Sequence, residues 1–129
     1  TDSTLKGQTV FLAERASELM QDNIITDRTI IDVMAFANCS KSMNYLEATD
    51  FGLFASNMLD EYDYIFYVSP EGVEIENNGV RETNEEYRKI VDEEIQLIIM
   101  KYRHMIKNLI EIKGSTVERI ELVKQTIFS

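Results

Sequence analysis

The stretch NIITDRTIIDVMAFA, residues 23–37, decides the fold class of this protein. It opens with a short apolar run, Ile24 and Ile25, which ends in the polar residues Thr26, Asp27 and Arg28. The sequence then becomes too densely apolar for a helix that faces water. We therefore expect a buried strand over residues 23–27 and a buried helix from about residue 29, with these apolar positions: Ile30, Ile31, Val33, Met34 and Phe36.

The rest of the chain continues this alternation of strands and helices. Helices are expected at about residues 6–20, 44–61, 84–105 and from 115, and strands at 62–68 and 109–112. Short, continuously apolar strands separated by helices predict an α/β fold, with a parallel sheet flanked by helices. The helical residues expected to face the core include Leu12 and Met20, Leu46, Leu53 and Phe54, Val91, Ile98 and Tyr102, and Val117 and Ile120.

The chain length and the cysteine count predict one domain in a reducing compartment. A length of 129 residues suits a single domain, and the lone Cys39 excludes an internal disulfide. The sequence contains neither a run of about 18 apolar residues nor a signal-peptide pattern, so we expect a cytoplasmic protein without a membrane partner. The chain starts at Thr1 rather than Met, so we expect its natural N-terminus upstream.

The charge balance argues against nucleic acid as a partner. The chain has 23 acidic and 13 basic side chains, and its formal net charge is −10. Binding to a nucleic-acid backbone needs clustered Lys and Arg. A few arginines can nevertheless form a local cationic pocket for a small phosphate ligand.

Ligands of parallel α/β sheets bind beyond the carboxyl ends of the strands. This rule selects three segments, at residues 26–28, 69–71 and 113–115. In the first of them, Asp27 could accept a proton from a hydroxyl, and Arg28 could neutralise a phosphate. Alternatively, Asp27 caps the following helix and Arg28 is its surface ion-pair partner. The dipeptide alone leaves both readings open.

The longer context resembles a known family. ITDRTIIDVMAFA resembles the segment of P-loop nucleoside and nucleotide kinases in which a strand ends in Asp-Arg and a helix follows. It looks closest to the group with nicotinamide-riboside kinase domains and related AAA-type ATPases, with thymidylate kinases more distant. The resemblance continues through EYDYIFYVSPEGVEIENNGVRETNEEYRKI and ends at NLIEIKGSTVERIELVKQTI, so it covers nearly the whole chain from about Gln8.

The resemblance implies a role for each matching residue. Asp27 would be the general base or would hold a magnesium-bound water without ligating the metal, and Arg28 would touch the acceptor or its phosphate. Asp32 would orient the acceptor's sugar, although a surface Asp on a helix fits equally well. Arg81 would close over the transferred phosphoryl group from a lid at about residues 71–90, with Arg88 as a weaker lid candidate. Lys113, Gly114 and Ser115 match the loop that packs against adenine; Ser115, with Glu118, also suits a helix cap.

The same resemblance implies ATP and Mg²⁺ as cofactors and a nucleoside, nucleotide or ribosyl compound as the acceptor. Such kinases need a G-x-x-x-x-G-K-[ST] loop, and these 129 residues contain none. The expectation is therefore a single, partial kinase-like domain that lacks the first strand and the phosphate loop. Either a longer protein supplies them, or another protein segment completes the sheet, or the resemblance misleads. The isolated chain is expected to be inactive, and a non-catalytic assembly module is the alternative function.

Overall fold

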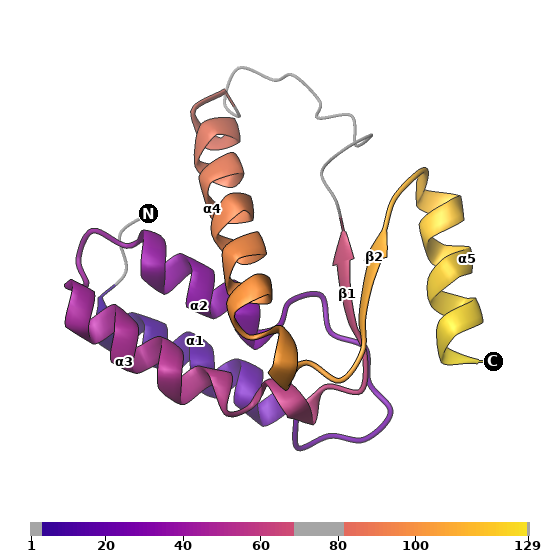
Figure 1. Ribbon diagram of the computed structural model, residues 1–129, viewed down its shortest axis with the longest axis horizontal. Helices are drawn as coiled ribbons and strands as arrows, with labels where there is room; N and C mark the ends of the chain where they lie inside the picture. Colours follow the sequence, from indigo (N-terminus) through magenta and orange to yellow (C-terminus); the bar gives the residue numbers. More distant parts are fainter. Residues whose placement is uncertain (1–3, 69–81, 129) are drawn as a thin grey trace.

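The computed structural model describes residues 4–68 and 82–128. It is a mixed α/β structure, mostly helical, with a small two-stranded parallel sheet (Figure 1). The expected order of elements is confirmed except at one strand. The elements are α1 (Leu5–Glu18), α2 (Ile30–Cys39), α3 (Tyr45–Ser56), η1 (Leu59–Glu61), β1 (Ile65–Val68), α4 (Glu82–Lys101), η2 (Arg103–Met105), β2 (Leu109–Ile112) and α5 (Thr116–Ile127), where η marks a 3-10 turn.

Three of the helices begin with reciprocal side-chain caps. At α2, the Thr29 hydroxyl accepts from the Ile31 amide at 3.1 Å, and the Thr29 amide donates to Asp32 Oδ2 at 2.8 Å. The same arrangement starts α3 and α5, and the sequence predicted the cap of α5. Such caps satisfy amides that have no partner within the helix, so they set where each helix begins.

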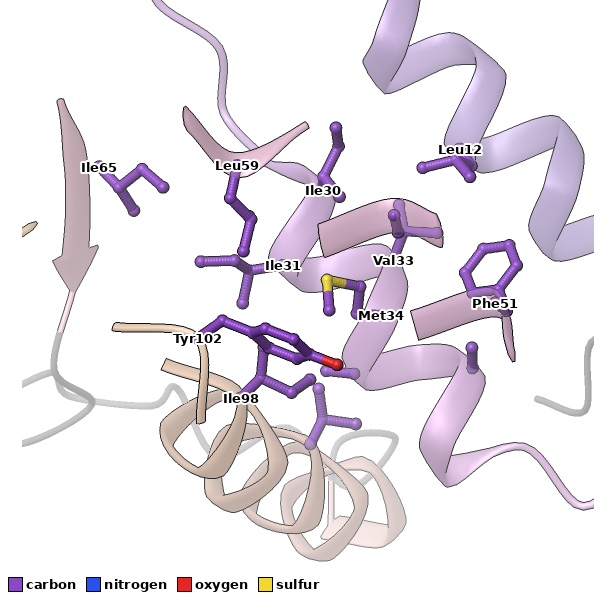
Figure 2. Packing of buried hydrophobic residues seen from close by; sticks show 14 of the residues in the cluster. Leu12, Ile30, Ile31, Val33, Met34, Phe51, Leu59, Ile65, Ile98 and Tyr102 are labelled. Atoms are coloured by element: carbon purple, nitrogen blue, oxygen red, sulfur yellow. The ribbon is translucent and has the colours of Figure 1, made fainter. Parts of the chain in front are cut away.

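Helix α2 lies at the centre of the core. It packs against α1, α3 and α4, and six of its ten residues are buried. A helix that is apolar around most of its circumference has to be enclosed by neighbours. Figure 2 shows the result: Val33 points toward Leu12 of α1, while Met34 lies close to Tyr102, which follows α4.

Some helical faces expected in the core are exposed. In α3, Leu46, Leu53 and Phe54 are exposed, and the buried face consists of Phe51, Gly52, Ala55 and Ser56. Helix α3 has apolar residues on several sides, so periodicity could not select the stripe that meets α2. In α5 every residue is exposed or half-buried, including Val117 and Ile120. Figure 1 shows α5 on the side of the strands away from α1–α4, so the main core does not cover it.

The sheet is smaller than expected. Strands β1 and β2 pair in parallel, with Ile65 opposite Leu109 and Val68 opposite Ile112. The strand predicted over residues 23–27 is wrong: the segment 21–29, described in full, contains no strand, and Ile25 is 75% exposed. A strand needs a neighbour for its backbone hydrogen bonds, and within residues 4–68 and 82–128 no strand pairs with the second edge of β1.

The Tyr62 hydroxyl joins the segment before β1 to the start of α2. It accepts a hydrogen bond from the buried Ile30 amide at 3.0 Å, and burial raises the pKa of Tyr62 to about 12. We expect Tyr62→Phe to lower the free energy of unfolding by about 1–2 kcal/mol, because the Ile30 amide loses its acceptor.

The pH dependence of stability tests whether the Tyr62 hydroxyl is responsible for this loss. The pKa of Tyr62 is raised above its ordinary value of 10.0, so its contribution to stability is complete below pH 10 and is lost as the pH rises toward 12. Urea denaturation at pH 7 and pH 11 should therefore show a smaller alkaline loss of stability in Tyr62→Phe than in the wild type. Equal losses in the two proteins would contradict this account.

Candidate functional site

A small pocket lies between α1 and the start of α2. It has a volume of about 250 Å³. We call it the α1–α2 pocket. Helix α1 supplies one wall and α2 the other, so the packing of these two helices forms it. Its lining residues are Gln8, Phe11, Glu14 and Arg15 from α1, Arg28, and Asp32, Val33 and Phe36 from α2.

A larger groove, here called the β1 groove, lies beside β1. Its volume is about 940 Å³, and its walls include residues 23–29, α2, β1, α4 and α5. Arg28, Asp32 and Phe36 line both this groove and the α1–α2 pocket, so the two cavities meet there. This junction is our candidate functional site. Two of its residues, Arg28 and Asp32, are among the site residues predicted from the sequence, whereas Asp27 lines the β1 groove only.

Arg28 is held at the junction by an aromatic ring. Its guanidinium lies 5.6 Å from the centre of the Phe36 ring, a cation–π contact, and the side chain remains exposed. Asp27 is also exposed and lines the β1 groove. The residue that caps α2 is Thr29 and not Asp27, so the alternative reading of Asp27 as a helix cap is wrong.

Asp32 has a structural task in addition to its place at the junction. Its Oδ2 accepts from the Thr29 amide at 2.8 Å and lies 3.5 Å from the Thr29 hydroxyl. A carboxylate at the first turn of a helix also interacts favourably with the helix dipole. These contacts explain an aspartate at position 32 without a ligand. They direct one of its carboxylate oxygens toward the start of α2.

The β1 groove gathers arginines from three parts of the chain. Arg28 precedes α2, Arg88 belongs to α4 and Arg119 belongs to α5. The sequence reading included Arg88 as a weaker candidate and missed Arg119. Arg119 is held by hydrogen bonds that its guanidinium donates to the Ser115 carbonyl at 3.4 Å and the Thr116 hydroxyl at 3.2 Å. Arg81, predicted to act in the lid, lies outside the described residues.

One wall of the groove carries a polar cluster. The Tyr67 hydroxyl donates to Asp92 Oδ1 at 2.6 Å, and the Gln96 amide donates both to the Tyr67 oxygen and to Asp92 Oδ2. Burial, followed by the hydrogen bond to Asp92 and its negative charge, raises the pKa of Tyr67. The cluster ties β1 to α4 and keeps the Tyr67 hydroxyl protonated.

The segment Lys113–Ser115 is accounted for by the start of α5. Gly114 has φ of +99°, and a Cβ at this position would lie 3.2 Å from the Glu118 carboxylate. Ser115 caps the helix, and the hydrogen bond from its amide lowers the pKa of Glu118. Lys113 Nζ lies 3.5 Å from Glu111 Oε1. Neither the α1–α2 pocket nor the β1 groove is lined by these three residues, so the structure does not bring them to the junction.

Known proteins provide no assignment for this site. The chain matches no protein-family model, no curated protein and no solved structure. Across residues 4–68 and 82–128, no group of three His, Cys, Asp or Glu side chains is placed to hold a metal ion. In the same part of the chain, no helix is long and apolar enough to cross a bilayer.

None of the four α1 residues that line the α1–α2 pocket was predicted from the sequence as a site residue. Gln8 and Arg15 lie on the same side of α1 as Leu12, which is buried. The available signal was the position of Gln8, four residues before Leu12, because residues at that spacing share a helical face. A polar residue on the buried face of a helix marks a place where a hydrogen-bond partner is required.

Proposed function

We propose that this chain forms the acceptor side of a P-loop kinase-like phosphotransferase that moves the γ-phosphoryl group of ATP to a nucleoside, nucleotide or ribosyl acceptor. The observation that carries the proposal is the position of Arg28, where the α1–α2 pocket opens into the β1 groove. A small pocket next to a larger, arginine-bearing groove suits an acceptor that meets a phosphate donor. The sequence resemblance to these kinases supports the same assignment.

In this proposal Arg28 of the junction and three other residues of the β1 groove have different roles. Arg28 binds the acceptor or its phosphate, because a guanidinium matches the geometry of phosphate oxygens and remains charged. Asp27, an exposed carboxylate next to Arg28 in sequence, accepts the proton of the attacking hydroxyl. Arg88 and Arg119 also line the β1 groove, whose lining has three arginines and six acidic residues, so they supply positive charge for an anionic group only locally.

The described residues by themselves do not form a binding site for ATP and Mg²⁺. Residues 4–68 and 82–128 offer no carboxylate cluster for the metal, and the 129-residue sequence has no glycine-rich phosphate loop. Both cofactors would have to be held by residues other than these. The proposal for the present chain is therefore restricted to acceptor binding, proton acceptance and neutralisation of charge. Reading the coding sequence upstream of Thr1 for such a loop is the first test.

Asp27→Asn tests the proposed base. In the full-length protein, with ATP, Mg²⁺ and a nucleoside acceptor, we expect about a 10²-fold loss of kcat, because asparagine cannot accept the proton. The loss is measured as transfer of radiolabelled phosphate to the acceptor. Asp50→Asn on the exposed surface of α3 removes the same charge and should leave turnover unchanged. Equal turnover in Asp27→Asn and the wild type would remove Asp27 from the mechanism.

A second candidate function is a module that assembles with another protein segment. It is favoured by the second edge of β1, which is unpaired within residues 4–68 and 82–128, and by the exposed Ile25 across the same groove. Unpaired strand edges readily accept a further strand. Slow amide exchange at Phe66 and Val68, in a protein without phosphoryl transfer, would favour this function over the first.

A further inference from the structure

The β1 groove runs along the second edge of β1. All four residues of the strand line it, although successive side chains of a strand point to opposite faces. Helix α4 supplies lining residues on one face and α5 on the other, and Figure 1 shows α4 and α5 on opposite sides of the strands. A cavity that reaches both faces of an edge strand lies where a further strand would continue the sheet.

The backbone of β1 points hydrogen-bonding groups into this groove. The Ile65 amide donates to the carbonyl of Asn108, next to β2, at 2.8 Å. Because amides alternate in direction along a strand, those of Phe66 and Val68 point away from β2 and toward the groove. Backbone amides need acceptors, and the carbonyls of an extended segment in the groove would supply them.

A strand in the groove would be covered by apolar side chains on both faces. Tyr67 binds Asp92, which places Tyr67 on the α4 face, so Phe66 and Val68 point to the face on which α5 lies. No residue of α5 is buried, and a further strand would give this helix more surface to cover. Strands covered on both faces are continuously apolar, in contrast to the alternating pattern of strands with one wet face.

The two ends of the groove differ in charge. Glu61 and Asp63 line it just before the strand begins at Ile65, and both are exposed. Arg88 and Arg119 lie near the starts of α4 and α5, and Figure 1 shows both helices starting at the end of the molecule toward which β1 points. The groove is therefore acidic at the amino end of β1 and basic at its carboxyl end.

The other charged residues of the groove leave this polarity in place. Asp92 lies near the carboxyl end, which then has two arginines against one carboxylate. Glu18 lies 2.7 Å from Arg15, outside the groove lining. The remaining charges come from the segment opposite β1, and they are Asp27, Arg28 and Asp32.

The direction and origin of the strand follow from the same features. Strands β1 and β2 are parallel, and sheets covered on both faces are typically parallel throughout. A second copy of this chain does not fit as the occupant, because its own β1 edge is enclosed by the same walls and cannot enter another groove. The occupant is therefore a strand of different sequence.

We propose that the β1 groove binds one extended, continuously apolar segment of a partner protein, which pairs in parallel with the second edge of β1. The segment carries a basic residue at its amino end and an acidic residue at its carboxyl end. Backbone hydrogen bonds supply affinity in such strand addition, and side chains supply specificity. This inference rests on the second candidate function, whose partner it defines, and does not depend on phosphoryl transfer.

Fluorescence polarisation with three short peptides tests the proposal. Lys-Val-Ile-Val-Ile-Val-Glu has the predicted charges and faces, Glu-Val-Ile-Val-Ile-Val-Lys exchanges the charges, and Lys-Val-Thr-Val-Thr-Val-Glu makes one face polar. Each carries a neutral dye at its amino terminus, is amidated, and is used at nanomolar concentration to prevent self-association. We expect the first peptide to bind the full chain at least about tenfold more tightly than either of the others. Equal affinity of the first peptide and either other one, or no binding of the first at about 0.1 mM protein, would overturn the proposal.

A double variant tests the charge matching. Asp63→Lys with Arg88→Glu changes an exposed charge at each end of the groove, so it should bind the first peptide no better than the second. Asp50→Lys with Lys89→Glu makes the same changes at exposed positions that do not line the groove, and it should keep the wild-type preference. An unchanged preference in the first double variant would refute the predicted charges of the segment.

Amide exchange locates the bound peptide. The first peptide should slow exchange at Phe66 and Val68 by about tenfold or more. Slow exchange at these amides in a dimer without peptide would identify a second copy as the occupant and refute the inference. If the peptides bind as expected while the full-length protein transfers no phosphoryl group, only the phosphotransferase proposal fails. Phosphoryl transfer by a protein that binds none of the peptides would refute this inference alone.

Discussion

Replacing Met34 by alanine is expected to lower the free energy of unfolding by about 2–5 kcal/mol. Met34 is 1% exposed and belongs to α2, the helix that α1, α3 and α4 surround. Truncation removes buried apolar surface and leaves a cavity that the three surrounding helices cannot all close. Urea denaturation measures the loss, which is a large part of the roughly 5–15 kcal/mol of an ordinary domain.

Met100→Ala is the matched control. Met100 belongs to α4 and is 75% exposed, so its truncation should change stability by no more than about 0.5 kcal/mol. Alanine is also the better helix former at an exposed position. A loss below about 1 kcal/mol in Met34→Ala would mean that the core around α2 repacks easily, against the arrangement in Figure 2.

Arg28→Ala is expected to reduce phosphoryl transfer by about 10²–10³-fold in kcat/KM, the cost of removing one positioned donor to a developing charge. The guanidinium rests on the Phe36 ring but is exposed, so stability should change by about 1 kcal/mol or less. A large kinetic effect with a small effect on folding is what separates a ligand contact from a structural one. Transfer of radiolabelled phosphate measures the loss of activity, and urea denaturation measures the change in the free energy of unfolding.

Two further variants sharpen the result. Arg28→Lys keeps the charge but loses the planar fork, so its turnover should lie between those of the wild type and Arg28→Ala. Lys107→Ala removes one exposed charge away from both cavities and should behave as the wild type. If Arg28→Ala turns over within twofold of the wild type, the junction is not the acceptor site.

The residues that line the two cavities differ in how far the sequence predicted them. Asp27 and Arg28 follow a short apolar run, and the rule for parallel sheets predicted them at the end of a strand. No strand precedes them, and both residues line the β1 groove. In the sequence, Gln8 lies 20 residues before Arg28, and Arg119 lies 91 residues after it. Only the packing of α1 and α5 brings them to the same cavities, and no local pattern contains that information.

The sequence by itself determined the helices, their starts and the parallel pair of strands. Helical hydrogen bonds and caps such as Ser115 with Glu118 join residues three or four positions apart, so local sequence is sufficient for them. Tertiary structure decided which faces of α3 and α5 are exposed, whether residues 23–27 form a strand, and which polar groups meet in the α1–α2 pocket. Each of these depends on a neighbour that is distant in sequence: a strand needs a partner for its backbone, and a helix buries only the stripe that another element covers.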